Sequence, residues 1–223
     1  MEIVGEAEDR WSNRAGWGTA AVVFIVAALT LPQGITDADN GEFLLVGVGG
    51  GIVHPPGYAF YASCLQLWNK IPLGLSPVIH LSLLSAVFGA LAAWFLFGFC
   101  RRMGVSVGAS MLATLATFGV VPVWRMNTLV EPFALHHLLL AMVLWLTARL
   151  KVKVNAPIEI LVMGLLWGLS FCNHHTMVFL VPVVLLHILG QNHDRATLSR
   201  ATVFFLFGFL IGLLPILSFF VVG

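Results

Sequence analysis

Apolar residues dominate the chain in runs that are close to the length of a membrane-spanning helix. A helix needs about 20 residues to cross the hydrocarbon core of a bilayer, and charged residues lie at the ends of several of these runs. The pattern predicts an all-α, polytopic membrane protein with about seven transmembrane helices. The predicted spans are residues 15–32, 77–100, 107–123, 132–150, 158–172, 177–190 and 202–222.

The first two predicted spans are separated by the longest polar interruption, which we expect to form a first outer loop over residues 33–76. Within this loop, residues 57–72 are aromatic and apolar but also carry Gln66, Asn69 and Lys70. This segment is too short and too polar to cross a membrane, so we predict an amphipathic helix that lies on the outer surface. Only residues 173–176 separate the fifth and sixth spans, which predicts either a tight hairpin near the surface or a dip inside the protein.

Composition supports a membrane protein and excludes several other classes. The 223 residues are 59% apolar and 9% charged, and their mean hydropathy is +0.97. The net charge of +1 comes without a basic run, so we expect no nucleic-acid partner. The three cysteines are far apart and lack the spacing of a metal or redox motif, so we expect them to be small apolar helix residues.

The distribution of lysine and arginine predicts the orientation of the chain. With a cytoplasmic N-terminus, nine of these residues lie in inside segments and only Lys70 and Arg125 lie outside. Residues 1–14 are then a polar cytoplasmic tail, and residues 15–223 form the transmembrane domain. The rule counts only lysine and arginine. The location of Asp37, Asp39 and Glu42 on the outer side is therefore an independent observation.

Asp39 and Glu42 are the first candidates for a catalytic site. They are three residues apart and would share one face of a helix, pointing toward one target. One of them can act as a general base that removes a proton from an acceptor, while the other positions the acceptor or holds a metal. The alternative is a solvated loop that merely contains acids.

Special backbone chemistry follows these acids in the same loop. Three successive glycines at residues 49–51 allow positive φ angles, and their amides could bind a phosphate, although such segments are also ordinary flexible loops. In the sequence His-Pro-Pro-Gly at residues 54–57, two prolines restrict the backbone and the glycine permits a reversal into the surface helix. This arrangement favours a fixed His54 that serves as a ligand or a phosphate partner, with a hydrogen-bonded structural histidine as the alternative.

Other candidates lie at the outer ends of later spans. Arg125 is one of the two outer cations and can meet a lipid phosphate, or simply extend to the headgroups. Glu131 precedes Pro132 at the start of a span, where a carboxylate also complements the helix dipole. His174 and His175 can bind phosphate, supply ligands or cap the next helix. Each of these residues can be interpreted as structural as well as functional.

Taken in order, these motifs resemble the multi-pass family related to protein O-mannosyltransferases, within the GT-C superfamily of membrane glycosyltransferases. The resemblance covers most of the chain from residue 31 onward. It rests on a set of motifs in chain order, which are the acid-Asn-Gly-Glu-Phe segment at 39–43, His-Pro-Pro-Gly-Tyr at 54–58, Trp124 with Glu131, and Asn-His-His-Thr at 173–176.

The resemblance implies a GT-C-like module whose first outer loop carries the catalytic acid, and a polyprenyl-phosphate-linked sugar as donor. Asp39 matches the catalytic acid, Glu42 its companion and His54 the histidine of the proline turn. The implied substrate-binding residues are His54, Tyr58, Arg125, Glu131, His174 and His175.

The expected function is transfer of the sugar to an acceptor hydroxyl on the outer face. The alternative is a non-catalytic GT-C-like subunit that binds lipid or packs in a larger membrane complex, so protein subunits are among the expected partners beside membrane lipid and the donor. We assign no metal ligands. The cofactor stays open, with a divalent cation among the alternatives.

Overall fold

The regular structure of the chain is helical, as the sequence predicts. The computed structural model describes residues 2–36, 38–54, 58–150, 157–189 and 194–217, and every regular element in those ranges is a helix. The elements are α1 (Glu2–Leu29), α2 (Ala38–Gly49), α3 (Ala59–Asn69), α4 (Pro77–Arg102), α5 (Val107–Gly119), α6 (Val121–Met126), α7 (Phe133–Arg149), α8 (Pro157–Asn173), the 3₁₀ helix η1 (His175–Leu180), α9 (Val181–Leu189), α10 (Arg195–Gly212) and the 3₁₀ helix η2 (Leu214–Leu217).

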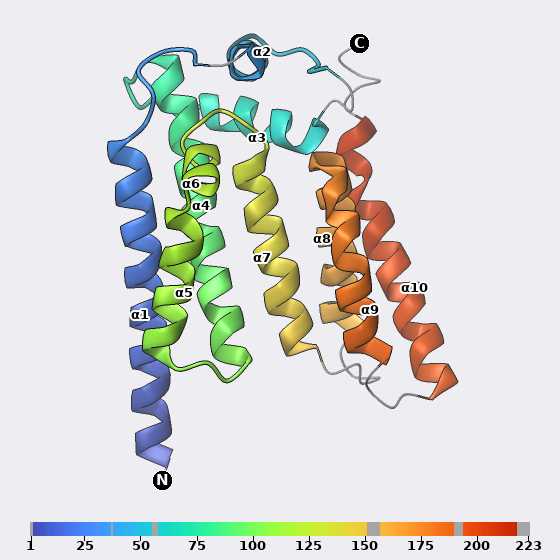
Figure 1. The fold of residues 1–223 in the computed structure, drawn as a ribbon. Coiled ribbons are helices and arrows are strands. Elements are labelled where there is room, and N and C mark those ends of the chain that lie inside the picture. Colours follow the sequence, from blue (N-terminus) through green and yellow to red (C-terminus); the bar gives the residue numbers. More distant parts are fainter. Residues whose placement is uncertain (1, 37, 55–57, 151–156, 190–193, 218–223) are drawn as a thin grey trace.

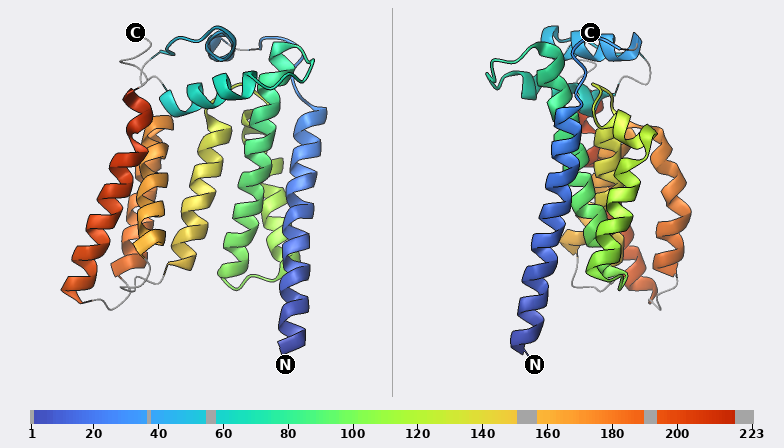
Figure 2. Two further views of the ribbon diagram at one scale, coloured as in Figure 1. Left: turned by 180° about the vertical axis from the view of Figure 1, so that it is seen from behind. Right: turned by 60° about the vertical axis from the view of Figure 1, so that its left-hand side comes forward.

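The long helices stand side by side as one bundle, and α2 and α3 lie across one end of it (Figure 1). We call this the α2–α3 end, and the end that holds the N-terminus the opposite end. The two further views in Figure 2 show the same arrangement, with α1 extending beyond the other helices at the opposite end. A helix within the predicted segment 57–72 is confirmed as α3, whereas its place on the outer membrane surface stays a prediction.

Two helical segments among the described residues are long and apolar enough to cross a membrane. They are α4 and the continuous segment formed by α10 and η2, residues 195–217. The helices that match the other predicted spans are apolar but shorter, or, in α1, begin with a polar half. The number of seven transmembrane helices and their orientation therefore stay predictions. The end of the seventh predicted span lies outside the described residues.

Two boundaries differ from the sequence prediction. The first helix begins at Glu2, so the residues predicted as a polar tail continue the helix, although their cytoplasmic location stays a prediction. The predicted span 107–123 is interrupted at Val120, which is extended, before α6 begins. Pro122 explains the break, since a proline inside a helix removes a hydrogen bond and collides with the preceding turn.

Side chains that accept backbone hydrogen bonds fix the starts of three helices. Ser76 and Ser106 accept from the amides of Ile79 and Ala109, at 3.5 and 3.3 Å. Asp194 Oδ1 accepts from the amide of Thr197 at 2.6 Å. Such caps satisfy amide groups that have no partner inside the helix. They explain why α4, α5 and α10 begin at the positions observed.

Helices α8 and α10 touch through glycines on facing surfaces. A Cβ atom added to Gly164 or Gly168 would collide with the backbone of α10, and one added to Gly208 or Gly212 would collide with the backbone of α8. Each pair has the small-xxx-small spacing that lets membrane helices approach closely. This contact fixes the side of the bundle on which His174 and His175 follow α8.

Candidate functional site

Helix α2 is held against the bundle by a buried apolar face. Phe43 is 1% exposed and packs edge-on against Tyr58 and Tyr61, with ring centroids 5.3 and 5.4 Å apart. A Cβ on Gly47 would lie 2.6 Å from a side-chain methyl of Leu81 of α4, so a larger residue there would force that side chain to move. The sequence prediction treated this segment as part of a loop. Packing against α3 and α4 makes it a helix in spite of its three glycines, which are poor helix formers.

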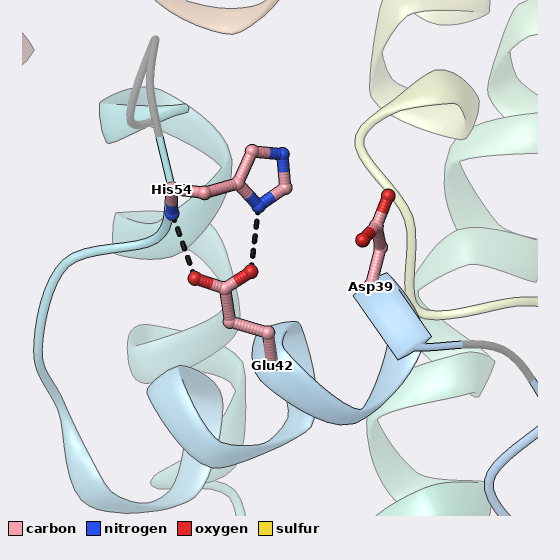
Figure 3. A group of neighbouring side chains, drawn as sticks. All are labelled: Asp39, Glu42 and His54. Carbon is pink, nitrogen blue, oxygen red and sulfur yellow. Dashed lines mark hydrogen bonds and ion pairs between the residues drawn. The ribbon is translucent and has the colours of Figure 1, made fainter.

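Glu42 and His54 form the central contact of the site (Figure 3). One carboxylate oxygen accepts the backbone N–H of His54 at 2.7 Å, and the other lies 2.6 Å from the Nδ1 atom of its ring. Their side chains are 36% and 38% exposed. Both oxygens of Glu42 are thus used to hold His54, which agrees with the prediction of a fixed histidine. The Pro-Pro-Gly segment invoked for it, residues 55–57, lies outside the described residues.

The contact changes the pKa of each partner. The hydrogen bond from Glu42 raises the pKa of His54 above 6.5, and the same bond lowers the pKa of Glu42 below 4.5. The contribution of His54 to stability is full below pH 6.5 and is lost as the pH rises through its raised pKa. The contribution of Glu42 is present above pH 4.5 and is lost as the pH falls through its lowered pKa. The pair is fully charged at pH values above the lowered pKa of Glu42 and below the raised pKa of His54. Solvent weakens this ion pair because both side chains are exposed.

Replacing Glu42 with glutamine is expected to lower the pKa of His54 toward 6.5, because a neutral amide does not stabilise the imidazolium ion. Titration of the His54 ring proton by NMR measures the change. Glu159→Gln removes a carboxylate that pairs with Arg149 at the opposite end of the bundle, and it should leave this titration unaltered. An unchanged His54 titration in the Glu42 variant would contradict the assigned contact.

Asp39 lies one helical turn before Glu42, in the first turn of α2, with its carboxylate on the same side (Figure 3). The predicted shared face is therefore observed. Its side chain is exposed, and no described residue forms a hydrogen bond with it. Unlike Glu42, Asp39 is available to an incoming substrate.

Asp39, Glu42 and His54 can also be considered as metal ligands, since one ligand atom from each lies within 4.8 Å of the others. Two carboxylates with one imidazole suit a divalent transition metal. The Glu42 oxygens are already hydrogen-bonded to His54, however, so this arrangement is satisfied as an ion pair. We derive no chemical step through a metal.

Tyr58 lies beside His54, with ring centroids 5.5 Å apart, and is the residue before α3. Its φ of +46° is in the left-handed region, which is unfavourable for a bulky side chain and is held here by ring contacts. Gly50 and Gly51 also have positive φ, as their residue type allows. Burial and then the carboxylates of Glu131, Asp39 and Glu42 raise the pKa of Tyr58, so its hydroxyl stays protonated as a donor.

Glu131 and Arg125 reach the α2–α3 end from the segment before α7. Glu131 is only 8% exposed and is near enough to raise the pKa values of both His54 and Tyr58. It thus belongs to the same charged group as Asp39. Arg125 is exposed on α6, at the same end of the bundle. Its contact with a phosphate stays a prediction.

His174 joins the site through its ring, whose centroid lies 6.2 Å from that of Tyr58. Its Nδ1 atom lies 2.7 Å from the hydroxyl of Thr176, which is 3.2 Å from the Nε2 atom of His136. Burial, and then the charge of His175, lower the pKa of His174. His175 itself lies beside Phe171, with ring centroids 6.3 Å apart.

Thr176 and His136 are members of the site that the sequence prediction did not select. Thr176 belongs to the Asn-His-His-Thr segment and could have been chosen with it. His136 had no such signal, because its neighbour His137 is equally plausible until the packing is known. In the structure His137 faces Asn127 instead, with Nδ1 3.4 Å from the amide oxygen.

Fold and site together define a helical membrane protein that carries an acid-rich site on helices lying across one end of its bundle. The chain belongs to the family described as the protein O-mannosyl-transferase TMEM260 N-terminal domain, whose model matches residues 39–197. The predicted relation to protein O-mannosyltransferases is thus confirmed. The matched segment begins at Asp39 and contains every predicted site residue.

One curated relative is protein O-mannosyl-transferase TMEM260 of Mus musculus, which is 32% identical over 218 residues. The alignment covers 92% of this chain and 30% of the relative, so the chain spans less than a third of the relative's length. No solved structure matches the chain. The relationship supports a glycosyltransferase-like role.

Proposed function

We propose that the chain carries the catalytic acid of a membrane glycosyltransferase that moves a sugar from a polyprenyl-phosphate-linked donor to an acceptor hydroxyl. The observation that carries the proposal is the exposed Asp39 carboxylate beside the Glu42–His54 pair. The name of the relative adds mannose as the sugar and a protein hydroxyl as the acceptor. Family membership supports the reaction class.

In the proposed reaction the acceptor oxygen attacks the anomeric carbon of the sugar while the bond from that carbon to the phosphate oxygen breaks. Asp39 accepts the hydroxyl proton as a general base. The bonding electron pair leaves with the polyprenyl phosphate, and a single displacement inverts the anomeric configuration. The departing phosphate gains negative charge, so cationic groups and hydrogen-bond donors aimed at it lower the barrier.

His54, which lies beside Asp39, can stabilise this charge. Its pKa is raised by Glu42, so more of it is protonated near neutral pH than of an ordinary histidine. The protonated Tyr58 hydroxyl can donate a further hydrogen bond, and Arg125 supplies a permanent charge. Glu42, whose oxygens hold His54, acts as a positioning residue in this scheme.

The distribution of charge supports an outer-face location for the site. Arg101, Arg102 and Arg149 lie at the ends of α4 and α7 that point away from α2 and α3. Positive residues of membrane proteins favour the cytoplasmic side. The α2–α3 end would then face the periplasm, the exterior or a lumen, where a polyprenyl donor can be presented from the membrane.

A transfer assay tests this function. Membranes that contain the protein should move radiolabelled mannose from a polyprenyl-phosphate donor to a serine- and threonine-rich peptide, and membranes without it should not. A nucleotide-linked mannose should not serve as donor when polyprenyl-phosphate mannose synthesis is blocked. Absence of transfer, together with a stable stoichiometric protein partner, would favour the non-catalytic subunit instead.

A further inference from the structure

A cavity of about 390 Å³ lies between α1, α4 and α7, near the opposite end from Asp39. We call it the arginine–tryptophan cavity, and its lining includes Ser12, Trp94, Arg101, Arg102 and Trp145. Its volume falls within the roughly 300–1,000 Å³ of small-molecule sites. None of the described residues that line it is acidic. The cavity is therefore a concave, positively charged feature that the proposed sugar transfer does not use.

The indole of Trp145 forms a fixed wall of this cavity. A Cβ on Gly98 would lie 2.9 Å from the indole nitrogen, so glycine lets the ring lie directly against α4. The guanidinium carbon of Arg102 lies 4.4 Å from the centre of the ring, and that of Arg149 lies 5.7 Å from it. Stacking on a tryptophan fixes the plane of a guanidinium and leaves its N–H groups directed outward from the edge.

The two arginines stacked on Trp145, Arg102 and Arg149, differ in whether they form an ion pair with a carboxylate. Arg149 pairs with Glu159, with Nε and Oε1 3.0 Å apart. Arg102 makes no ion pair with a carboxylate in the described ranges. Arg101 completes the wall, donating to the Ser12 hydroxyl at 3.1 Å and to the carbonyl of Val105 at 2.6 Å. The cavity thus presents the guanidinium of Arg102 in a fixed orientation and without an ion pair to a described carboxylate. The guanidinium of Arg101 lies beside it and links α4 to α1.

We propose that the arginine–tryptophan cavity binds a phosphate group. Guanidinium recognises phosphate oxygens with two parallel hydrogen bonds, which are the strong, charge-assisted kind. Arg102 supplies these bonds, and Arg101 adds positive charge beside them. The described lining residues include no acid, so none of them repels an anion.

Two carriers of the phosphate fit this chemistry, a membrane lipid and a soluble phosphate ester. The surface beside the cavity favours the lipid, because α1 continues from it with exposed Trp17, Val22, Ile25 and Val26. Acyl chains could cover this surface while the headgroup occupies the cavity. The experiment below separates the two carriers.

Calorimetric titration of the purified, detergent-solubilised chain tests the proposal. The probes are dioctanoyl phosphatidylglycerol, dioctanoylglycerol without phosphate, and glycerol 3-phosphate. Phosphatidylglycerol is expected to bind, and Arg102→Gln should weaken that binding by about tenfold or more because a charge-assisted contact is lost. Arg14→Gln is the matched control, since it removes one exposed positive charge from α1 outside the cavity lining. Arg102→Lys keeps the positive charge but loses the planar guanidinium, so its affinity for phosphatidylglycerol should lie between those of the wild-type chain and of Arg102→Gln.

Each outcome decides the proposal. Binding of phosphatidylglycerol that depends on Arg102 but not on Arg14 supports it, with a lipid as carrier if glycerol 3-phosphate fails to bind. Binding of glycerol 3-phosphate with the same dependence supports it with a soluble carrier. Equal affinity of the wild-type chain for phosphatidylglycerol and dioctanoylglycerol overturns the proposal. An equal loss of affinity for phosphatidylglycerol in the Arg14→Gln and Arg102→Gln variants also overturns it. The comparison on the wild-type chain holds even if Arg102→Gln fails to fold.

Discussion

Asp39→Asn is expected to lower the rate of sugar transfer by roughly 10²–10⁴-fold, the usual contribution of a general base. Asparagine keeps the size of the side chain but cannot accept the proton of the acceptor hydroxyl. Because Asp39 makes no hydrogen bond with a described residue and is exposed, the change should leave the fold intact. The measurement is the turnover of polyprenyl-phosphate mannose in the membrane assay, with binding of the donor recorded separately.

The matched control for this prediction is Asp194→Asn. Asp194 caps α10, and asparagine caps a helix about as well as aspartate, so transfer and stability should both be nearly unchanged. The His54 titration reports on the site itself, because the Glu42–His54 bond does not require Asp39. Full turnover by the Asp39 variant would remove the proposed base. A loss of turnover accompanied by loss of the Glu42–His54 contact would show a structural effect instead.

Gly208→Ala is expected to destabilise the bundle by about 1–3 kcal/mol, the cost of inserting one carbon into a closely packed contact. The added carbon would overlap the backbone carbonyl of Leu161, which cannot rotate away as a side chain would. Helices α8 and α10 must then move apart, and Gly164 and Gly168 lose their close contact as well. The thermal unfolding midpoint of the detergent-solubilised chain measures the effect.

Gly18→Ala makes the same chemical change in α1, where an added Cβ meets nothing within 4 Å. Alanine is the better helix former by up to about 1 kcal/mol, so this control should be neutral or slightly stabilising. If the two variants had the same midpoint, the close approach of α8 and α10 would be wrong. The comparison isolates the contact because both substitutions add one methyl group to a helix.

Much of the fold could be predicted because its signals are local. Apolar run length indicates helices, and residues 57–72 were predicted to form a separate short helix, which is α3. The four residues between the fifth and sixth spans predicted a short connection, either a hairpin or a dip, and in the structure only His174 separates α8 from η1. The two Gly-xxx-Gly pairs were also a readable signal, but their partners could not be assigned, since that spacing does not identify the facing helix.

The sequence predicted the candidate residues of the site better than it predicted the contacts between them. The spacing of Asp39 and Glu42 gave their shared face, and the outer location of the candidates agrees with their gathering at the α2–α3 end. The pairing of Glu42 with His54 was not predicted, because twelve residues separate them and the intervening chain must return to α2. The link from His174 through Thr176 to His136 spans 40 residues and depends on where α7 meets the start of η1.

The sequence by itself determined the helical class of this protein, its membrane character, its family and the acids that carry the proposed chemistry. Hydropathy, helical spacing and short motifs establish these features, and each needs only neighbouring residues. Tertiary structure alone decided that residues 38–49 form a helix, that Glu42 holds His54, and that the α8 and α10 glycines touch. The physical reason is that a glycine-rich segment becomes helical only when packing supports it, and that a hydrogen bond or a close backbone contact requires both partners to be placed within a few ångströms.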